Sequence, residues 1–283
     1  MGLRRELASG VFYTAVAKYA GMAVTLLVTA ILARHFTPEE FGIVNIATVF
    51  IAFFALLSDL GIGPAIIQKD LSDKDLEGVF NLTLVTGAVL SILFFFCANL
   101  IASFYENNWV LKALLKLLSV SIFFNSANIV PNALIMKAKR FSFVAVRSFV
   151  VQLVCGGAAV AAAYLGLGIY ALIINPIASS VIIFFVNYFQ RPLNPIRGIT
   201  KDTFKKIASY SLFQFLFQFL NYFSRNLDKL LMGKYMSMSE LGYYDKSFRL
   251  MLMPLQNITY VITPVMHPIF TQIQKGSMPN IRG

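Results

Sequence analysis

Long runs of apolar residues without charges recur along this chain, and they limit what it can fold into. A helix of about 18 or more apolar residues is long enough to cross roughly 30 Å of hydrocarbon. Apolar residues make up 58% of the 283 residues and charged residues only 13%, whereas a soluble domain has roughly one half and one quarter. One soluble core cannot bury this excess, so the sequence predicts an all-α, polytopic bundle of transmembrane helices.

The apolar runs and the breaks between them predict eight membrane-spanning helices. We expect the first helix to be retained rather than cleaved as a signal peptide, because its apolar stretch is too long and contains Lys18. The last contains three prolines, which are tolerated where neighbouring helices re-satisfy the freed backbone groups. The expected spans are 10–34, 42–66, 79–103, 111–134, 143–165, 168–189, 208–232 and 241–272.

Basic residues are concentrated in alternate connections between these spans. Cytoplasmic loops of membrane proteins are enriched in Lys and Arg, so this bias predicts a cytoplasmic N-terminus. It also accounts for most of the net charge of +11 without a nucleic-acid partner. The residues expected on the cytoplasmic side are Arg4, Arg5, Lys69, Lys74, Lys137, Lys139, Arg140, Arg191, Arg197, Lys201, Lys205, Lys206, Lys275 and Arg282.

The longest polar connection divides the chain. Residues 191–206 contain two prolines and five basic residues, and they are predicted to form a basic cytoplasmic linker. Before it, residues 1–190 are expected to form a six-helix lobe. After it, residues 207–274 are expected to supply the first two helices of a second lobe, followed by a polar tail at 275–283.

An internal repeat supports this division, because many transporters are built from duplicated bundles. Shifting the chain by 200 residues matches the two halves without a gap over about 60 residues. Chance similarity between apolar helices is the alternative explanation. The identical pairs are Ala8 with Ala208, Ser9 with Ser209, Leu27 with Leu227, Glu40 with Glu240, Gly42 with Gly242, Ile62 with Ile262 and Pro64 with Pro264.

Three segments carry a resemblance to a known family. They read RHFTPEEFG at 34–42, SDLGIGPAIIQ at 58–68, and NLDKLLMG at 226–233 followed by LGYY at 241–244. The chain resembles the polysaccharide transporter family, the Wzx-type O-antigen and exopolysaccharide flippases of the multidrug/oligosaccharidyl-lipid/polysaccharide exporter superfamily. The resemblance extends over the whole chain, and the third segment is its most specific part.

The resemblance implies a MATE-like pair of six-helix lobes around a central cavity. It also implies a function: a membrane transporter, not an enzyme and without a cofactor, that flips polyprenyl-pyrophosphate-linked oligosaccharide across the bacterial inner membrane. Membrane lipids and the polysaccharide polymerase or glycosyltransferase machinery are the further partners that it suggests. The chain ends after eight expected helices, so we expect it to be truncated and to lack the rest of the second lobe; the alternative is that another chain supplies that part.

Charged side chains inside the expected spans are the candidates for a binding site, because an unpaired charge at mid-membrane is costly and usually faces a cavity. Four cations, Lys18, Arg147, Arg225 and Arg249, are predicted to line the cavity and contact the pyrophosphate. The alternative is that such charges pair along a helical face or extend to the membrane surface. Lys18 and Arg225 are the deepest in their spans and therefore the better candidates.

Other charged residues in the spans suggest a second role, in ion coupling or gating. The candidates for this role are Asp59, Asp228 and Lys229. Asp59 precedes Gly61, Gly63 and Pro64, which indicates a helix that breaks, and the favoured interpretation is that Asp59 binds local backbone donors. Polar amides could bind sugar hydroxyls or join helices. They are Asn45, Asn81, Asn125, Asn128, Asn175, Asn221 and Gln214.

Three other functions compete with a flippase. A drug or cation antiporter would need an embedded acidic site, whereas embedded cations are in excess here. A lipid-modifying enzyme would need a carboxylate or metal constellation, usually on a large extramembrane loop, and the expected loops are short. A truncated, non-transporting product is the third alternative.

Overall fold

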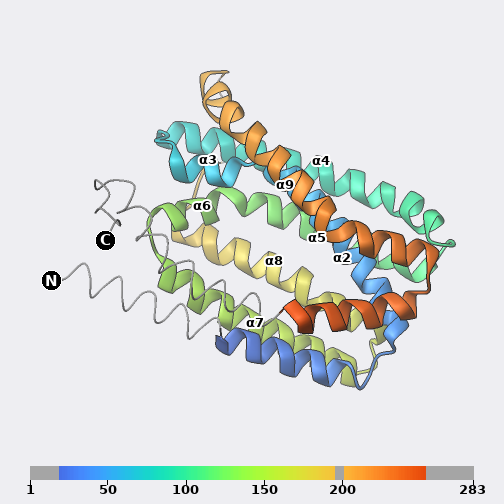
Figure 1. Ribbon diagram of the computed structural model, residues 1–283. Coiled ribbons are helices and arrows are strands. Elements are labelled where there is room, and N and C mark those ends of the chain that lie inside the picture. Colours follow the sequence, from blue (N-terminus) through green and yellow to red (C-terminus); the bar gives the residue numbers. More distant parts are fainter. Residues whose placement is uncertain (1–18, 195–200, 253–283) are drawn as a thin grey trace, which may run out of the picture.

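The computed structural model describes residues 19–194 and 201–252, and every regular element in these residues is a helix. Figure 1 shows the helices packed side by side as a bundle, with α9 running obliquely across it. The elements are Tyr19–Leu32, α2 (Pro38–Asp59), α3 (Ile62–Gln68), α4 (Asp73–Phe104), α5 (Trp109–Ala127), α6 (Ile129–Lys137), α7 (Phe141–Tyr164), η1 (Gly168–Tyr170), α8 (Ala171–Gln190), α9 (Lys201–Tyr235) and a helix at 238–252.

Five helical segments among the described residues are long and apolar enough to cross a membrane. The prediction of an all-α polytopic membrane bundle is therefore confirmed. The expected spans 10–34 and 241–272 lie partly outside the described residues, and α9 is not among the five because polar residues interrupt its apolar sequence. The five segments are Pro38–Asp59, Asp73–Phe104, Trp109–Lys137, Phe141–Tyr164 and Gly168–Gln190.

Two of the expected spans are not single helices. The expected span 42–66 contains two helices, because Leu60 and Gly61, with left-handed φ of 43° and 75°, form the break between α2 and α3 that the segment after Asp59 predicts. A left-handed residue cannot continue a right-handed helix. The expected span at 111–134 lies within the apolar segment Trp109–Lys137, where α5 and α6 meet at Asn128 in a right-handed conformation. Residues 201–206 of the predicted linker already belong to α9.

The bundle is built from helix pairs that follow each other in sequence and from longer-range contacts. α4 packs against α5, α7 against α8, and α2 against both α5 and α9. The main core lies among α2, α4 and α5 and includes the fully buried Leu111, Leu114 and Leu118. Gly156 of α7 lies close to the first helix, because a Cβ added there would lie 2.9 Å from the side chain of Val28. Close contact with the first helix requires a glycine there.

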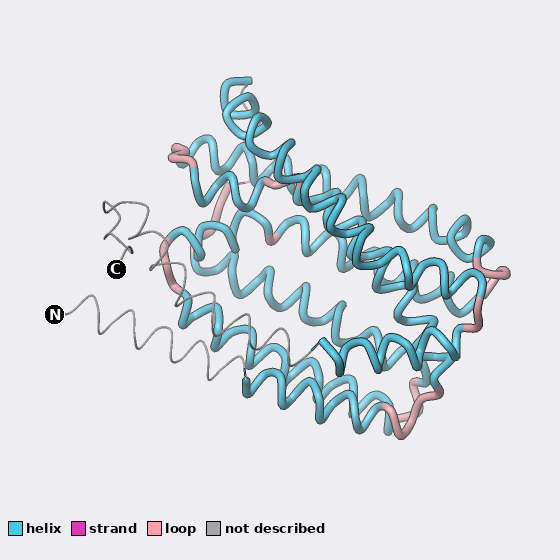
Figure 2. The backbone as a smooth tube through the Cα atoms, in the orientation of Figure 1, coloured by secondary structure: helices cyan, strands magenta, loops and turns pink. Residues whose placement is uncertain are grey.

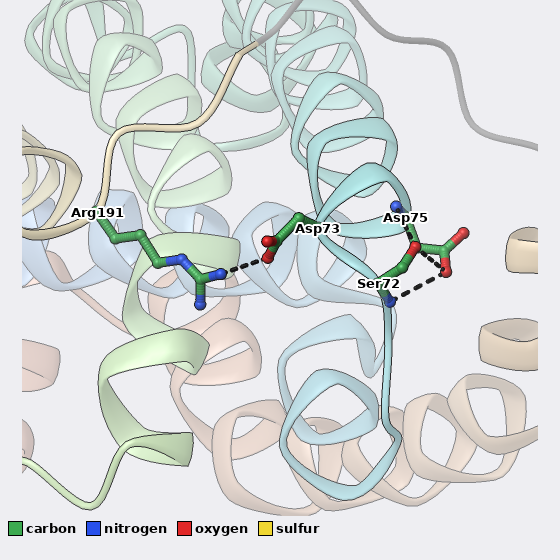
Figure 3. A network of polar contacts seen from close by, with 4 residues as sticks. All are labelled: Ser72, Asp73, Asp75 and Arg191. Carbon is green, nitrogen blue, oxygen red and sulfur yellow. Dashed lines mark hydrogen bonds and ion pairs between the residues drawn. The ribbon is translucent and has the colours of Figure 1, made fainter.

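The connections between helices lie at the two ends of the bundle (Figure 2). At one end, the α3–α4 connection contacts α6 through Lys137, whose Nζ donates to the Lys69 carbonyl at 2.5 Å and pairs with Asp70 at 3.3 Å. Figure 3 shows the start of α4 at this end, where Ser72 and Asp75 form a capping box and Arg191, just after α8, contacts Asp73. Each exposed ion pair is worth about 1 kcal/mol or less, but together these contacts align three helix ends.

At the opposite end of the bundle, α2 and the 238–252 helix touch through their backbones. A Cβ added at Gly42 would lie 1.9 Å from the Met238 carbonyl oxygen, and one added at Gly242 would lie 1.9 Å from the Pro38 carbonyl oxygen. Only glycine permits such an approach. The two contacts are reciprocal, because residue 42 meets residue 238 and residue 242 meets residue 38. Residues 38 and 238, and residues 42 and 242, are each related by the 200-residue shift. Reciprocal contacts of this kind are expected where two equivalent helices cross about a local two-fold axis.

The starts of these two helices are also equivalent. Thr37 caps α2 by accepting from the Glu40 backbone N–H at 3.3 Å, and Glu40 accepts from the Thr37 backbone N–H at 2.8 Å. Ser237 and Glu240 repeat the arrangement at 3.1 and 2.8 Å. A capping box satisfies two backbone donors that a helix start leaves free. The internal repeat is therefore expressed in matching caps as well as in matching glycines.

Buried charges connect α9 to the 238–252 helix. Asp245 is buried and accepts from Arg249 Nε at 2.9 Å, while the Lys229 ammonium lies 3.8 Å from its other oxygen. The Tyr244 hydroxyl donates to Asp228 at 2.6 Å. We call this set the α9 junction. The α9 junction contains two carboxylates, two cations and a phenol from one pair of helices. Most of its charged groups therefore have a partner within the junction itself.

We predict that Gly42→Ala and Gly242→Ala destabilise the protein to similar extents, each by about 1–3 kcal/mol, because the new methyl group overlaps a carbonyl oxygen that belongs to the neighbouring helix. The measurement is the thermal unfolding midpoint of the purified full chain in detergent. Gly157→Ala is the control, since nothing lies within 4 Å of its added Cβ. Equal midpoints for Gly42→Ala and Gly157→Ala would contradict the close approach.

We further predict that Asp245→Asn lowers the free energy of unfolding by about 3 kcal/mol or more, because it leaves the largely buried Lys229 without its counter-charge. Arg249→Gln should cost much less, since Asp245 keeps Lys229 and the Arg249 side chain is 56% exposed. Unfolding midpoints of both variants under the same conditions give the comparison. If the two substitutions had equal effects, Asp245 would not be the centre of the junction.

Candidate functional site

A cleft of about 360 Å³ lies between α2 and α9, and we call it the α2–α9 cleft. Its α2 wall is made largely of small side chains, with Asp59 at the end of the helix. Its α9 wall is polar. The lining residues are Ala52, Ala55, Leu56 and Asp59 from α2, and Gln218, Asn221, Tyr222, Arg225 and Asn226 from α9.

The polar wall follows from the sequence of α9. Residues 218, 221, 222, 225 and 226 recur at spacings of three and four, so they share one face of the helix. Tyr222 fixes this face by donating its hydroxyl to the Val49 carbonyl at 2.7 Å. This polar stripe is also the reason that α9 falls short of a simple apolar span. The helix is amphipathic, and its polar face is directed into the cleft.

The aromatic residues of α9 hold it against α2. The Phe53 ring lies 6.2 Å from Phe219, 5.5 Å from Tyr222 and 5.9 Å from Phe223, centroid to centroid. Phe219, Tyr222 and Phe223 therefore lie at the contact between α9 and α2. Aromatic pairs at such distances add about 0.5–1.5 kcal/mol each beyond the area that they bury. They therefore position Arg225 relative to α2.

Arg225 is the cation of the α2–α9 cleft. Its Nε donates to the Asn221 side-chain oxygen at 3.2 Å, one turn earlier on α9. It is exposed, and it forms no ion pair with the side chains that the structure describes, those of residues 19–194 and 214–252. Pairing along α9 with Asp228, the alternative for such a charge, is not seen, and Asp228 accepts from Tyr244. The guanidinium fork remains available for an anionic ligand.

A second cleft, of about 310 Å³, opens on the other side of Asp59, and we call it the α6 cleft. It is lined by Asp59, Gly63, Pro64, Ile67, Asn125, Asn128, Ile129, Asn132, Ala133 and Met136. Asp59 thus borders both clefts. Its Oδ1 accepts the Gly63 backbone N–H at 3.1 Å across the break between α2 and α3. The predicted helix break and the predicted backbone contact of Asp59 are both confirmed.

Arg147 contacts the α6 cleft indirectly. Its Nη1 donates to the Asn132 side-chain oxygen at 3.4 Å and also to that of Asn187, and it is not one of the residues that line the cleft. Asn187 in turn donates to the Asn128 side-chain oxygen at 2.7 Å. Asn132 and Asn187 were not among the amides singled out from the sequence. The spacing of four residues from Asn128 to Asn132 was the signal that could have revealed the first.

The remaining candidate residues fall elsewhere. Lys229, Asp228 and Arg249 belong to the α9 junction, where the two cations pair with Asp245 and Asp228 accepts from the Tyr244 hydroxyl. Lys18 lies outside the described residues. The structure therefore brings Arg225 and Asp59 to one cleft. It separates Arg147 and Arg249 from that cleft.

Comparison with known proteins places this arrangement in a family. Residues 31–279 match the family described as polysaccharide biosynthesis protein. The chain is 23% identical to the teichuronic acid biosynthesis protein TuaB of Bacillus subtilis (strain 168), over 95% of this chain and 56% of that protein. It is 25% identical to the lipopolysaccharide biosynthesis protein WzxC of Escherichia coli (strain K12), over 97% of this chain and 56% of that protein.

A third relative is the succinoglycan biosynthesis transport protein ExoT of Rhizobium meliloti (strain 1021), 22% identical over 95% of this chain and 54% of that protein. The chain spans a little more than half the length of these curated relatives. No solved structure matches it. The family match covers most of the chain and the helices are those of a membrane bundle, so this protein is a multi-pass membrane protein that belongs to the polysaccharide biosynthesis protein family.

Proposed function

We propose that this chain is part of a transporter that flips polyprenyl-pyrophosphate-linked oligosaccharide across the bacterial inner membrane during polysaccharide biosynthesis. The observation that carries the proposal is Arg225, a cation on the polar face of α9 that has no ion pair among the side chains described, in a cleft beside α2. Two relatives support the substrate class by their names, a lipopolysaccharide biosynthesis protein and a succinoglycan transport protein.

The physical need for such a cation follows from the cargo. A flippase must bring a pyrophosphate and a polar glycan past the hydrocarbon, whereas the polyprenyl chain can stay in lipid. A charge inside the bilayer is costly unless it is paired or hydrated, so a fixed guanidinium in a polar cleft lowers the cost of hosting the anion. Arginine also matches phosphate oxygens through two parallel N–H donors. No covalent step is needed, and we propose no enzymatic role.

The distribution of basic residues supports one orientation. Lys69, Lys137, Lys139, Arg140 and Arg191 all lie at the end of the bundle that holds the α3–α4 and α6–α7 connections. Cytoplasmic loops carry such an excess, so we place this end in the cytoplasm, with the N-terminus on the same side. Both clefts contain Asp59, which lies toward this end of α2. The lipid-linked substrate would therefore enter from the side on which it is synthesised.

We predict that Arg225→Ala in the full-length protein lowers polysaccharide export at least about tenfold, because a hydrogen bond to a charged group contributes about 1.5–3 kcal/mol. Arg225→Lys should retain part of the activity, since it keeps the charge without the fork. Export is measured as surface polysaccharide in a strain that lacks its own exporter. Immunoblots establish that each variant is equally abundant.

Leu227→Ala is the matched control for this experiment. Leu227 lies on the same helix, two residues away, and is 48% exposed, but it does not line the cleft. It should export at the level of the unmodified protein. Undiminished export by Arg225→Ala, at equal abundance, would refute the proposed role of the α2–α9 cleft.

A further inference from the structure

A chain of side-chain hydrogen bonds runs from α7 to the wall of the α6 cleft. Arg147 donates to the side-chain oxygens of Asn132, on α6, and Asn187, on α8. The amide nitrogen of Asn187 donates to the side-chain oxygen of Asn128 at 2.7 Å. Asn187 is 1% exposed, so its contacts are made inside the protein. The four residues come from neighbouring segments at one end of the bundle (Figure 1).

Arg147 determines how these amides are oriented. A guanidinium has only N–H donors, so the atoms of Asn132 and Asn187 that face it must be the oxygens. The nitrogen of Asn187 is then directed at Asn128, whose facing atom must also be an oxygen. Each amide that receives a hydrogen bond on its oxygen has its nitrogen left as a donor. One cation thereby sets the polarity of three side chains.

The consequence is a cleft with a donor wall and an acceptor wall. Asn128 and Asn132 both line the α6 cleft, and both have their oxygens engaged outside it, so the N–H groups are what they offer to a ligand. Asp59 lines the same cleft and offers a carboxylate. Of its two oxygens, Oδ1 already accepts from Gly63, which leaves Oδ2 for a ligand donor.

This combination selects the chemical class of the ligand. A hydroxyl group both donates and accepts, so a ring that carries several hydroxyls can satisfy the amide donors and the carboxylate together. A phosphate group has acceptors only, and the lining of this cleft, unlike that of the α2–α9 cleft, contains no cation to offset the charge of Asp59. A metal cation needs several oxygen ligands, and the amide oxygens of Asn128 and Asn132 accept from Asn187 and Arg147, which do not line the cleft. The volume of about 310 Å³ is within the range of small-molecule sites, roughly 300–1,000 Å³.

We propose that the α6 cleft binds a neutral, hydroxyl-bearing sugar, and that Arg147 is a positioning residue for this site rather than a cation that touches the pyrophosphate. The proposal rests on the proposed function, because the sugar is taken to be a unit of the transported glycan. The two clefts that share Asp59 would then bind different parts of the same head group. Arg225 holds the anionic part, and the amide wall holds the adjacent sugar.

The test is ligand protection of a cysteine in the α6 cleft of the purified full-length protein. Met136 lines this cleft, so Met136→Cys, in a background with Cys97→Ala and Cys155→Ala, is labelled with a thiol reagent. The probes are glucose, galactose and N-acetylglucosamine, with inorganic pyrophosphate for comparison. We expect at least one of the sugars to slow labelling severalfold and pyrophosphate to have no effect. If none of the sugars slowed labelling, the proposal would be overturned.

Three substitutions separate positioning from a merely structural role. The glutamine of Arg147→Gln can accept hydrogen bonds as well as donate them, so it no longer fixes the orientation of the amides and should abolish protection by sugar. The lysine of Arg147→Lys can only donate, so this variant should keep the protection. Asn132→Asp keeps a partner for Arg147 and removes the donor to the cleft, so it should fold normally and lose protection. Val150→Ala, on the exposed side of α7, is the control and should behave like the parent. Full protection in Arg147→Gln and Asn132→Asp would contradict the assignment.

The outcome can be told apart from failure of the proposed function. Sugar protection that depends on Arg147, together with normal export by Arg225→Ala, would leave the sugar site standing and overturn the proposed transport role of the α2–α9 cleft. Loss of export in Arg225→Ala without any sugar protection would leave the transport proposal standing and overturn the sugar site.

Discussion

The backbone contact between α2 and the 238–252 helix is the constraint on which the rest of the structure depends. Gly42 and Gly242 each meet a carbonyl of the opposite helix, so the two helix starts have almost no freedom to separate or slide. The matching capping boxes fix where each helix begins. With this end held, α9 lies against α2 through Phe53 and Tyr222, and the small residues Ala52 and Ala55 leave the space that becomes the cleft.

The charges of the bundle fall into two groups according to their surroundings. At the α9 junction, Asp245 compensates Lys229 and Arg249, and a buried carboxylate with two cations is stable only because both are close. In the α2–α9 cleft, Arg225 has an amide neighbour and, among the residues described, no acid paired with it. The spacing of these cations in the sequence does not show which of them has an acidic partner. The partners in the structure distinguish a cation that is part of an ion pair from one that is available to a ligand.

The sequence was sufficient for the class of fold and for much of its detail. Apolar runs predicted the membrane helices, the motif after Asp59 predicted the break, and the 200-residue shift predicted the equivalence of Gly42 and Gly242. It was not sufficient for the partners of charged residues. Asp228 and Tyr244 are on different helices, so no periodicity within α9 could reveal their contact. The hydrogen bonds of Arg147 could not be predicted for the same reason, because Asn187 is forty residues away.

The central claim is that Arg225 makes the α2–α9 cleft a site for the anionic head group of a lipid. Calorimetric titration of the purified full-length protein with polyprenyl pyrophosphate, and with the corresponding uncharged polyprenol, measures this directly. The account predicts that Arg225→Ala weakens binding of the pyrophosphate at least about tenfold and leaves binding of the alcohol unchanged. Equal affinity of both proteins for the pyrophosphate would contradict it.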